Sequence, residues 1–166
     1  MVWSGIKWDA GRIRRFGLYP KVGQMFVGQY EHNLDEKGRL TIPSGYRDLL
    51  SSGAYVSLGF EDNLMIWRAE TFSSLYHKVE EKPYSDETAR NFGRFMFANA
   101  SYVEMDKAGR ILIPQYLRDA AGLDGQVKLS GSGRYIEVWT PEKFDKNQAI
   151  FKDGKKRAEY FQNLGV

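Results

Sequence analysis

The chain contains one segment twice. Residues 35–48 are DEKGRLTIPSGYRD and residues 106–119 are DKAGRILIPQYLRD, which agree at seven of fourteen positions. Two unrelated segments of average composition would agree at about one position. Further matches follow at an offset one residue longer, where Gly59, Trp67, Glu70 and Phe72 align with Gly131, Trp139, Glu142 and Phe144. The chain is therefore expected to fold as two copies of one supersecondary unit.

Each copy begins with residues that alternate between apolar and polar on both sides of a short loop. In the first copy the loop is EKG; Leu34 and Leu40 share one face, while Asp35 and Arg39 share the other. The second copy has the same pattern around KAG. A period of two around a loop that contains glycine predicts a β-hairpin.

Glycine and proline indicate where the elements of each copy end. The last residue of a tight hairpin loop often needs a positive φ, which glycine adopts without a Cβ clash. Proline ends a strand and suits the first turn of a helix, and glycine commonly follows a helix. These positions are the turn-forming glycines Gly38 and Gly109, the prolines Pro43 and Pro114, and the helix-ending glycines Gly53 and Gly122. Each copy is thus predicted to contain a hairpin, a short helix and a second hairpin, with SGSG at 130–133 as a hairpin loop.

The expected fold class is mainly β with short helices (α+β). We expect an N-terminal extension at 1–24, a first repeat at 28–73, a helical linker at 74–99 broken at Pro83, a second repeat at 100–143, and a charged, partly helical tail at 144–166. The extension has two interpretations. It is a mobile basic arm, or Met25 is the natural start, and we favour the second.

Composition narrows the function classes. Apolar residues are 42% of the chain, enough for a core, and the chain has no cysteine for disulfides or thiolate metal sites. The two histidines, His32 and His77, are far apart, so no metal or cofactor is expected. No secretory signal, membrane-length apolar run or nucleophile motif is found, which predicts a cytoplasmic protein that is not an enzyme.

Positive charge is unevenly distributed along the chain. The net charge is +3, but residues 1–24 hold five basic side chains and one acidic one, so the remainder carries −1. A nucleic-acid site in the repeated body would therefore have to be local, and the overall field would attract DNA weakly.

The repeated Asp-x-x-x-Arg motif is the candidate site. One interpretation is an exposed cross-strand ion pair worth about 0–1 kcal/mol. The other is that each aspartate holds an arginine in a fixed direction, so that its remaining donors point at a phosphate or at guanine O6 and N7. Lysines at the loops add positive charge. The candidate DNA-binding residues are Arg39, Arg110, Lys37, Lys107, Asp35 and Asp106.

Two further repeated pairs have structural interpretations. Arg47 and Arg118 lie on the expected short helices, where we expect each to pair with the adjacent aspartate or with a carbonyl at the helix C-terminus. Trp67 and Trp139 lie among aliphatic residues, and core packing is their expected role.

The segments MFVGQYEHNLDEKGRLTIPSGYRDLL, VEMDKAGRILIPQYLRDAAGL and KLSGSGRYIEVW resemble the MraZ family, bacterial transcriptional regulators with two SpoVT-AbrB-type repeats. The resemblance covers roughly residues 25–145. It implies a pseudo-twofold swapped-hairpin β-barrel built from two tandem repeats, and protomers assembled into a ring. The chain departs from the family in its extension and in Ala108, which stands where the first copy has Lys37.

The same resemblance implies a function. Family members bind repeated short boxes in double-stranded DNA upstream of the division and cell-wall gene cluster, including their own operon, and typically repress it. Their DNA contacts correspond here to Asp35–Arg39 and Asp106–Arg110. No small-molecule substrate or membrane is implied, and the protein would be associated with the nucleoid.

Two alternatives remain at this point. The first is a ring-forming scaffold or protein-interaction module whose Asp–Arg pairs hold protomers together without specific DNA binding. The second is the DNA-binding antitoxin of a toxin pair, against which the two copies count, because such antitoxins usually carry one copy and a disordered tail.

Overall fold

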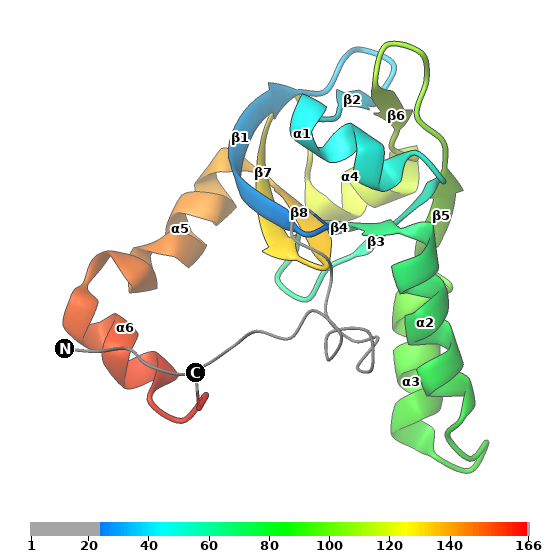
Figure 1. The fold of residues 1–166 in the computed structure, drawn as a ribbon, viewed down its shortest axis with the longest axis vertical. Coiled ribbons are helices and arrows are strands. Elements are labelled where there is room, and N and C mark those ends of the chain that lie inside the picture. Colours follow the sequence, from blue (N-terminus) through cyan, green and yellow to red (C-terminus); the bar gives the residue numbers. More distant parts are fainter. Residues whose placement is uncertain (1–23, 166) are drawn as a thin grey trace, which may run out of the picture.

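A computed structural model describes residues 24–165 of the protein (Figure 1). The expectations for the N-terminal extension lie outside the described residues, except for Gln24. In chain order the elements are β1 (Phe26–Asn33), β2 (Arg39–Thr41), α1 (Ser44–Arg47), the 3-10 turn η2 (Asp48–Leu50), β3 (Ala54–Leu58), β4 (Leu64–Arg68), α2 (Ala69–Glu80), α3 (Glu87–Met96), β5 (Ala100–Val103), β6 (Arg110–Leu112), α4 (Gln115–Ala121), β7 (Gln126–Gly133), β8 (Tyr135–Trp139), α5 (Pro141–Lys152) and α6 (Gly154–Phe161). The fold is mixed α and β with antiparallel sheets.

Six strands form one sheet in the order β1-β7-β8-β4-β3-β5. The pairs β1–β7, β4–β8 and β3–β5 each join a strand of one copy to a strand of the other, and all three are antiparallel. Only β3–β4 and β7–β8 are pairs within a copy. The corresponding strands of the two copies are β1 and β5, β3 and β7, and β4 and β8. Exchanging the members of each pair gives the same strand order read backwards. The two copies therefore build a single sheet together.

The two remaining strands, β2 and β6, pair only with each other and form a two-stranded ribbon. The expected first hairpin of each copy is confirmed only next to its loop, where the N–H of Asp35 donates to the Arg39 carbonyl at 3.0 Å and that of Asp106 donates to the Arg110 carbonyl at 2.8 Å. Beyond the bridge Leu34–Leu40 the expected ladder is wrong, because β1 and β5 pair with strands of the other copy. Alternation of apolar and polar residues fixes which face is buried, but it does not identify the partner strand. That is why the local hairpin was expected in place of pairing between copies.

The main hydrophobic core lies between the six-stranded sheet and a cover made of α1, α4 and the ribbon. This core buries residues from the central strands, the ribbon and α4, among them Ile66, Val138, Leu40, Ile111 and Leu117. The expected closed barrel is wrong, because the sheet is open and β1 and β5 are its two edges. The cover already buries the apolar face, so core formation does not require the edges to meet.

A second apolar cluster lies on the opposite face of β4. Met65 and Trp67 alternate with the main-core residues of that strand and pack with Phe72 of α2 and Met96 of α3. Trp67 is 7% exposed and Trp139 is 3% exposed, so the expected core role of both tryptophans is confirmed. The helices expected on either side of Pro83 are also confirmed.

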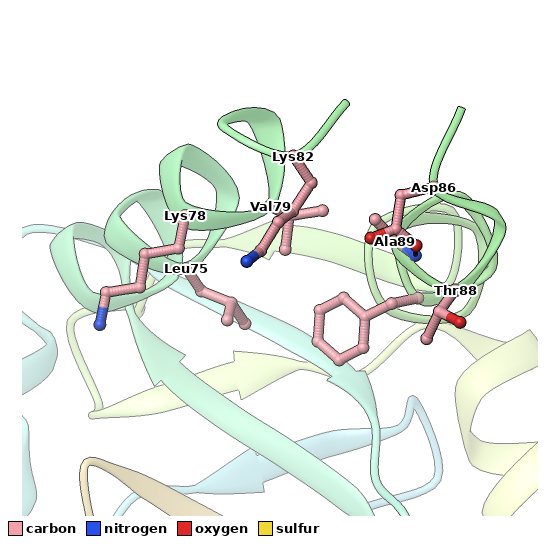
Figure 2. Close-up of a pocket in the computed structure, with 8 residues that line it drawn as sticks. Leu75, Lys78, Val79, Lys82, Asp86, Thr88 and Ala89 are labelled. Atoms are coloured by element: carbon pink, nitrogen blue, oxygen red, sulfur yellow. Dashed lines mark hydrogen bonds between the residues drawn. The ribbon is translucent and has the colours of Figure 1, made fainter. Parts of the chain in front are cut away.

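The helices α2 and α3 project from the sheet as a hairpin (Figure 1). Asp86 caps α3 by accepting a hydrogen bond from the backbone N–H of Ala89. Between the two helices is a cavity of about 340 Å³ with Leu75, Val79 and Phe92 in its lining (Figure 2). No described helix is long and apolar enough to cross a membrane.

The tail forms a second projection, α5 followed by α6, on the opposite side of the sheet (Figure 1). Thr140 caps α5 and Asp153 caps α6, each through its side chain. Phe151 and Phe161 stack with their ring centroids 5.7 Å apart, which holds the two helices together. The partly helical tail expected from the sequence is thus almost wholly helical.

The segment SGSG at 130–133 lies inside β7, so its expected role as a hairpin loop is wrong. It pairs with the start of β1, and the chain reverses at Arg134. The two strands lie close together at Gly131, where a Cβ atom would be 2.5 Å from the carbonyl carbon of Phe26 and from the backbone nitrogen of Val27. The glycine permits this close approach.

We expect Gly131→Ala to lower the free energy of unfolding by about 1–3 kcal/mol, because backbone atoms of β1 would have to move. Urea denaturation of the full chain measures this change. Gly45→Ala is the matched control, since a Cβ at Gly45 meets no atom within 4 Å, and it should leave stability equal or slightly raised. Equal midpoints for wild type and Gly131→Ala would contradict the expectation.

Candidate nucleic-acid interface

Two tight loops, 35–38 and 106–109, project at one end of the molecule beside the β2–β6 ribbon (Figure 1). In each loop the glycine has a positive φ, 77° at Gly38 and 76° at Gly109. Its N–H donates to the carbonyl of the loop's first residue, Asp35 or Asp106, at 2.9 and 3.0 Å. A residue with a Cβ would be strained in this conformation, which explains glycine in both loops.

The aspartate of the first loop accepts three hydrogen bonds. Its Oδ1 accepts from the backbone N–H of Lys37 at 3.0 Å and from that of Arg39 at 2.9 Å. Its Oδ2 accepts from Nε of Arg39 at 2.6 Å. Asp35 therefore fixes both the loop backbone and the direction of the Arg39 side chain.

The second loop repeats this arrangement atom for atom. Oδ1 of Asp106 accepts from the N–H groups of Ala108 and Arg110, both at 2.9 Å, and Oδ2 accepts from Nε of Arg110 at 2.9 Å. Among the described residues, the terminal nitrogens Nη1 and Nη2 of Arg39 and Arg110 have no hydrogen-bond partner. The two arginines thus present unpaired donors in fixed directions.

Both ion pairs are partly exposed. The side chains of Arg39 and Arg110 keep 32% and 33% of their area open to solvent. Pairs this exposed contribute little to stability, about 0–1 kcal/mol. Their effect is therefore mainly to orient the arginines.

The hydrogen bond from the backbone N–H of Arg39 lowers the pKa of the Asp35 carboxyl below its ordinary value of 3.8, and the Arg39 side chain adds to this effect. The backbone N–H of Arg110 lowers the pKa of Asp106 in the same way. Both carboxylates therefore stay ionised, and stay paired with their arginines, to a lower pH than an ordinary aspartate would.

The ribbon places the two arginines on one face. Its register pairs Arg39 with Leu112 and Thr41 with Arg110, while Leu40 and Ile111 point to the core. Side chains alternate along a strand, so the first two pairs share the outer face. This face carries an oriented arginine near each end.

Two more arginines reach the loops, each from the other copy. A Cβ at Gly38 would overlap the guanidinium of Arg118, and a Cβ at Gly109 would overlap that of Arg47. Nε of Arg118 donates to the carbonyl of Ile113 at 3.0 Å, and Nε of Arg47 makes the equivalent 3.0 Å bond to Ile42. We call these the glycine–arginine contacts.

Backbone hydrogen bonds complete the glycine–arginine contacts. The N–H of Ile113 donates to the carbonyl of Gly38 at 3.0 Å, and that of Ile42 donates to Gly109 at 2.8 Å. The expected pairing of Arg47 and Arg118 with a neighbouring aspartate or a helix C-terminal carbonyl is therefore wrong. Each binds the carbonyl of the isoleucine that directly follows its ribbon strand, Ile42 or Ile113, and covers a loop of the other copy.

The loop end of the molecule is locally basic. Six basic side chains lie in the loops, on the ribbon or against the loops, with three acidic ones; they are Lys37, Arg39, Arg47, Lys107, Arg110 and Arg118, with Asp35, Glu36 and Asp106. Both loop lysines are exposed. Residues 24–165 contain no group of three or more histidine, aspartate or glutamate side chains that could hold a metal ion.

Sequence comparison agrees with the two-copy architecture. A family model described as "MraZ protein, putative antitoxin-like" matches residues 25–95 and again residues 96–162. The chain belongs to the MraZ family. Curated MraZ relatives include the "Transcriptional regulator MraZ" of Roseiflexus castenholzii, 38% identical over 76% of this chain and 94% of the relative, and that of Acetivibrio thermocellus, 42% identical over 73% and 85%. The protein of the same name from Herpetosiphon aurantiacus is 36% identical over 86% of this chain and its own full length.

The MraZ chain described here brings together all six candidate residues expected from the sequence. Sequence reasoning missed the place of Arg47 and Arg118 and the exposure of Leu112, which is 55% exposed on the outer face of the ribbon. The repetition of Arg47 and Arg118 at one spacing was a usable signal. For Leu112 the signal was an apolar residue where the alternation calls for a polar one.

The lowered pKa values predict how the Asp–Arg pairs depend on pH. Their contribution to stability is present above pH 3.8, the ordinary aspartate value, and is lost as the pH falls through the lower folded value. Carboxyl ¹³C NMR titration of the folded protein should give midpoints below 3.8 for Asp35 and Asp106. A midpoint at or above 3.8 would contradict the hydrogen bonding described.

The variant Arg39→Ala separates the two causes of the lowered Asp35 pKa, which are the backbone N–H and the side chain of Arg39. In Arg39→Ala the backbone N–H remains, so the Asp35 midpoint should rise only part of the way toward 3.8. The Asp106 midpoint in the same variant is the internal control and should not change.

Proposed function

We propose that this protein is a sequence-specific DNA-binding transcriptional regulator whose β2–β6 ribbon enters the major groove. The observation that carries this proposal is the pair of aspartate-held arginines on the outer face of the ribbon, with their terminal donors unpaired. The name "Transcriptional regulator MraZ" of its relatives supports the same class of function.

The proposed contact has a simple geometry. The major groove of B-DNA is about 12 Å wide and admits a two-stranded β-ribbon. Nη1 and Nη2 of an arginine can donate together to O6 and N7 of guanine, the commonest specific base contact. Because Asp35 and Asp106 hold the two arginines in place, little side-chain entropy is lost on binding.

The other basic side chains would position the duplex. Lys37 and Lys107 lie at the exposed loop tips, where they can contact phosphates on either side of the groove. Arg47 packs against Gly109 and Arg118 against Gly38, so these two arginines support the loops. The arginines of the ribbon then determine sequence, and the lysines determine affinity and register.

We further propose that the protomers form a ring that binds repeated boxes upstream of the protein's own operon, in the division and cell-wall gene cluster, in the cytoplasm at the nucleoid. The proposed organisation is two SpoVT-AbrB-type repeats, 28–73 and 100–143, that exchange hairpin strands about a pseudo-twofold axis. A protomer with one small basic end binds a single box weakly. Several linked protomers on repeated boxes can raise affinity by about 10²–10⁴.

The proposal predicts the effect of removing both ribbon arginines. Arg39→Ala with Arg110→Ala should abolish the mobility shift of DNA from upstream of the protein's own gene, with the oligomeric mass unchanged by light scattering. The control Arg94→Ala removes one exposed arginine on α3, remote from the ribbon, and should bind as wild type. If the double variant binds DNA normally, the ribbon arginines are not the DNA contact; if it dissociates into smaller particles, the scaffold hypothesis replaces this one.

Salt dependence provides a second test. The slope of log K against log salt should be steeply negative in wild type and lose about one unit for each removed side chain that contacts a phosphate. Lys37→Ala with Lys107→Ala should reduce the slope and weaken all sequences alike. Unchanged slopes would show that the loop lysines do not contact the phosphates.

A further inference from the structure

The outer face of the ribbon carries one exposed apolar residue, Leu112, which lies opposite Arg39 and two residues after Arg110. Leu112 is 55% exposed, although the neighbouring ribbon residues of the other parity, Leu40 and Ile111, are almost completely buried. A single exposed leucine is ordinary on a protein surface. Its position on the face proposed to meet DNA makes this one informative.

The register places Leu112 directly opposite Arg39. Side chains in such a cross-strand pair have Cβ atoms about 4.5–5.5 Å apart. The two side chains therefore start side by side on the outer face, while Asp35, on the edge of β2 away from β6, holds Nε of Arg39. A duplex that covers this end of the ribbon meets both residues.

The equivalent position at the other end of the ribbon is different. Thr41 is the first-copy counterpart of Leu112, it lies opposite Arg110, and it is less exposed. The arginines and their aspartates are the same in both copies. The difference between leucine and threonine therefore distinguishes two otherwise matching ends.

We propose that Leu112 contacts the 5-methyl group of a thymine next to the guanine bound by Arg39. This inference rests on the proposed DNA-binding function and adds a specificity-determining residue to it. Thymine alone among the four bases presents a methyl group in the major groove, and apolar side chains recognise it by contact. Bases stack about 3.4 Å apart and the two Cβ atoms are about 4.5–5.5 Å apart, so the two side chains leave the ribbon about one to two base pairs apart.

The chemistry favours thymine over the other occupants of this position. Cytosine offers an amino donor and guanine two acceptors, and Leu112 can pair with none of these, so such a group would lose its water without compensation. A methyl group loses nothing on meeting leucine and gains from the removal of apolar surface from water. Burying one such carbon is worth about fourfold in affinity.

The proposal makes the two ends of a box unequal. At the Arg39 end, guanine and the adjacent thymine are recognised together. At the Arg110 end, threonine is shorter and partly covered, so the arginine alone supplies most of the preference. A bound box should therefore have a direction even though the ribbon is nearly symmetric.

The experiment uses the full chain and DNA from upstream of its own gene. Each thymine is replaced in turn by deoxyuridine, which removes only the methyl group, and affinity is measured by fluorescence anisotropy. Wild type should lose about fourfold at one thymine in each box. Leu112→Asn, which is close to leucine in size and has no methyl group, should bind thymine and deoxyuridine equally there. The control Thr41→Ala should keep the fourfold difference.

The outcomes distinguish this inference from the proposed function. If wild type binds the upstream DNA but no thymine is sensitive to deoxyuridine, or if Leu112→Asn retains the difference, the role of Leu112 is overturned and DNA binding stands. If wild type does not bind the unmodified DNA, the proposed function fails with it. Circular dichroism of Leu112→Asn checks that the variant is folded.

Discussion

The arrangement of the loop end depends on the glycine–arginine contacts. Each contact joins a loop of one copy to the helix that follows the ribbon strand of the other. Because a Cβ would overlap the guanidinium, only glycine allows the arginine to lie so close. The carbonyl of that glycine also accepts the backbone bond that continues the ribbon ladder. Ribbon, loops and short helices are therefore fixed together, and neither copy can form this end alone.

This constraint gives the Asp–Arg pairs their significance. Taken separately, a partly exposed ion pair adds little stability and would be one among many on a protein surface. Here the loop backbone that carries each aspartate is fixed by the ribbon and by an arginine of the other copy. The carboxylate therefore has a fixed position, and it orients the arginine that it binds. Three hydrogen bonds to each aspartate lower its pKa, and the outer donors of the arginine have no partner within residues 24–165. Weak interactions on a rigid frame produce a preorganised surface.

Much of the fold could be predicted from the sequence, because repetition and period-two alternation are strong local signals. They gave the two copies, the buried face at Leu40 and Ile111, the helices on either side of Pro83, and the positions where glycine is needed. Strand partners could not be predicted, since alternation is equally satisfied by a neighbour in the same copy or in the other. The expected hairpin ladder was wrong for that reason, and so was the SGSG loop, because residues 130–133 pair with β1 of the other copy. The barrel was implied by the family resemblance and not by alternation. The aspartate-held arginines followed from local spacing, whereas the place of Arg118 over Gly38 depends on contacts 80 residues apart.

The six-stranded sheet has a consequence for how its two halves can differ. Its strand order is the one that two identical subunits would adopt if they shared a sheet about a twofold axis, with β4 and β8 at the centre. Two identical subunits must carry the same side chain at both ends of such a ribbon. A single polypeptide has no such restriction, so Thr41 and Leu112 can be mutated independently of each other. Covalent fusion thereby allows a symmetric scaffold to present an asymmetric surface.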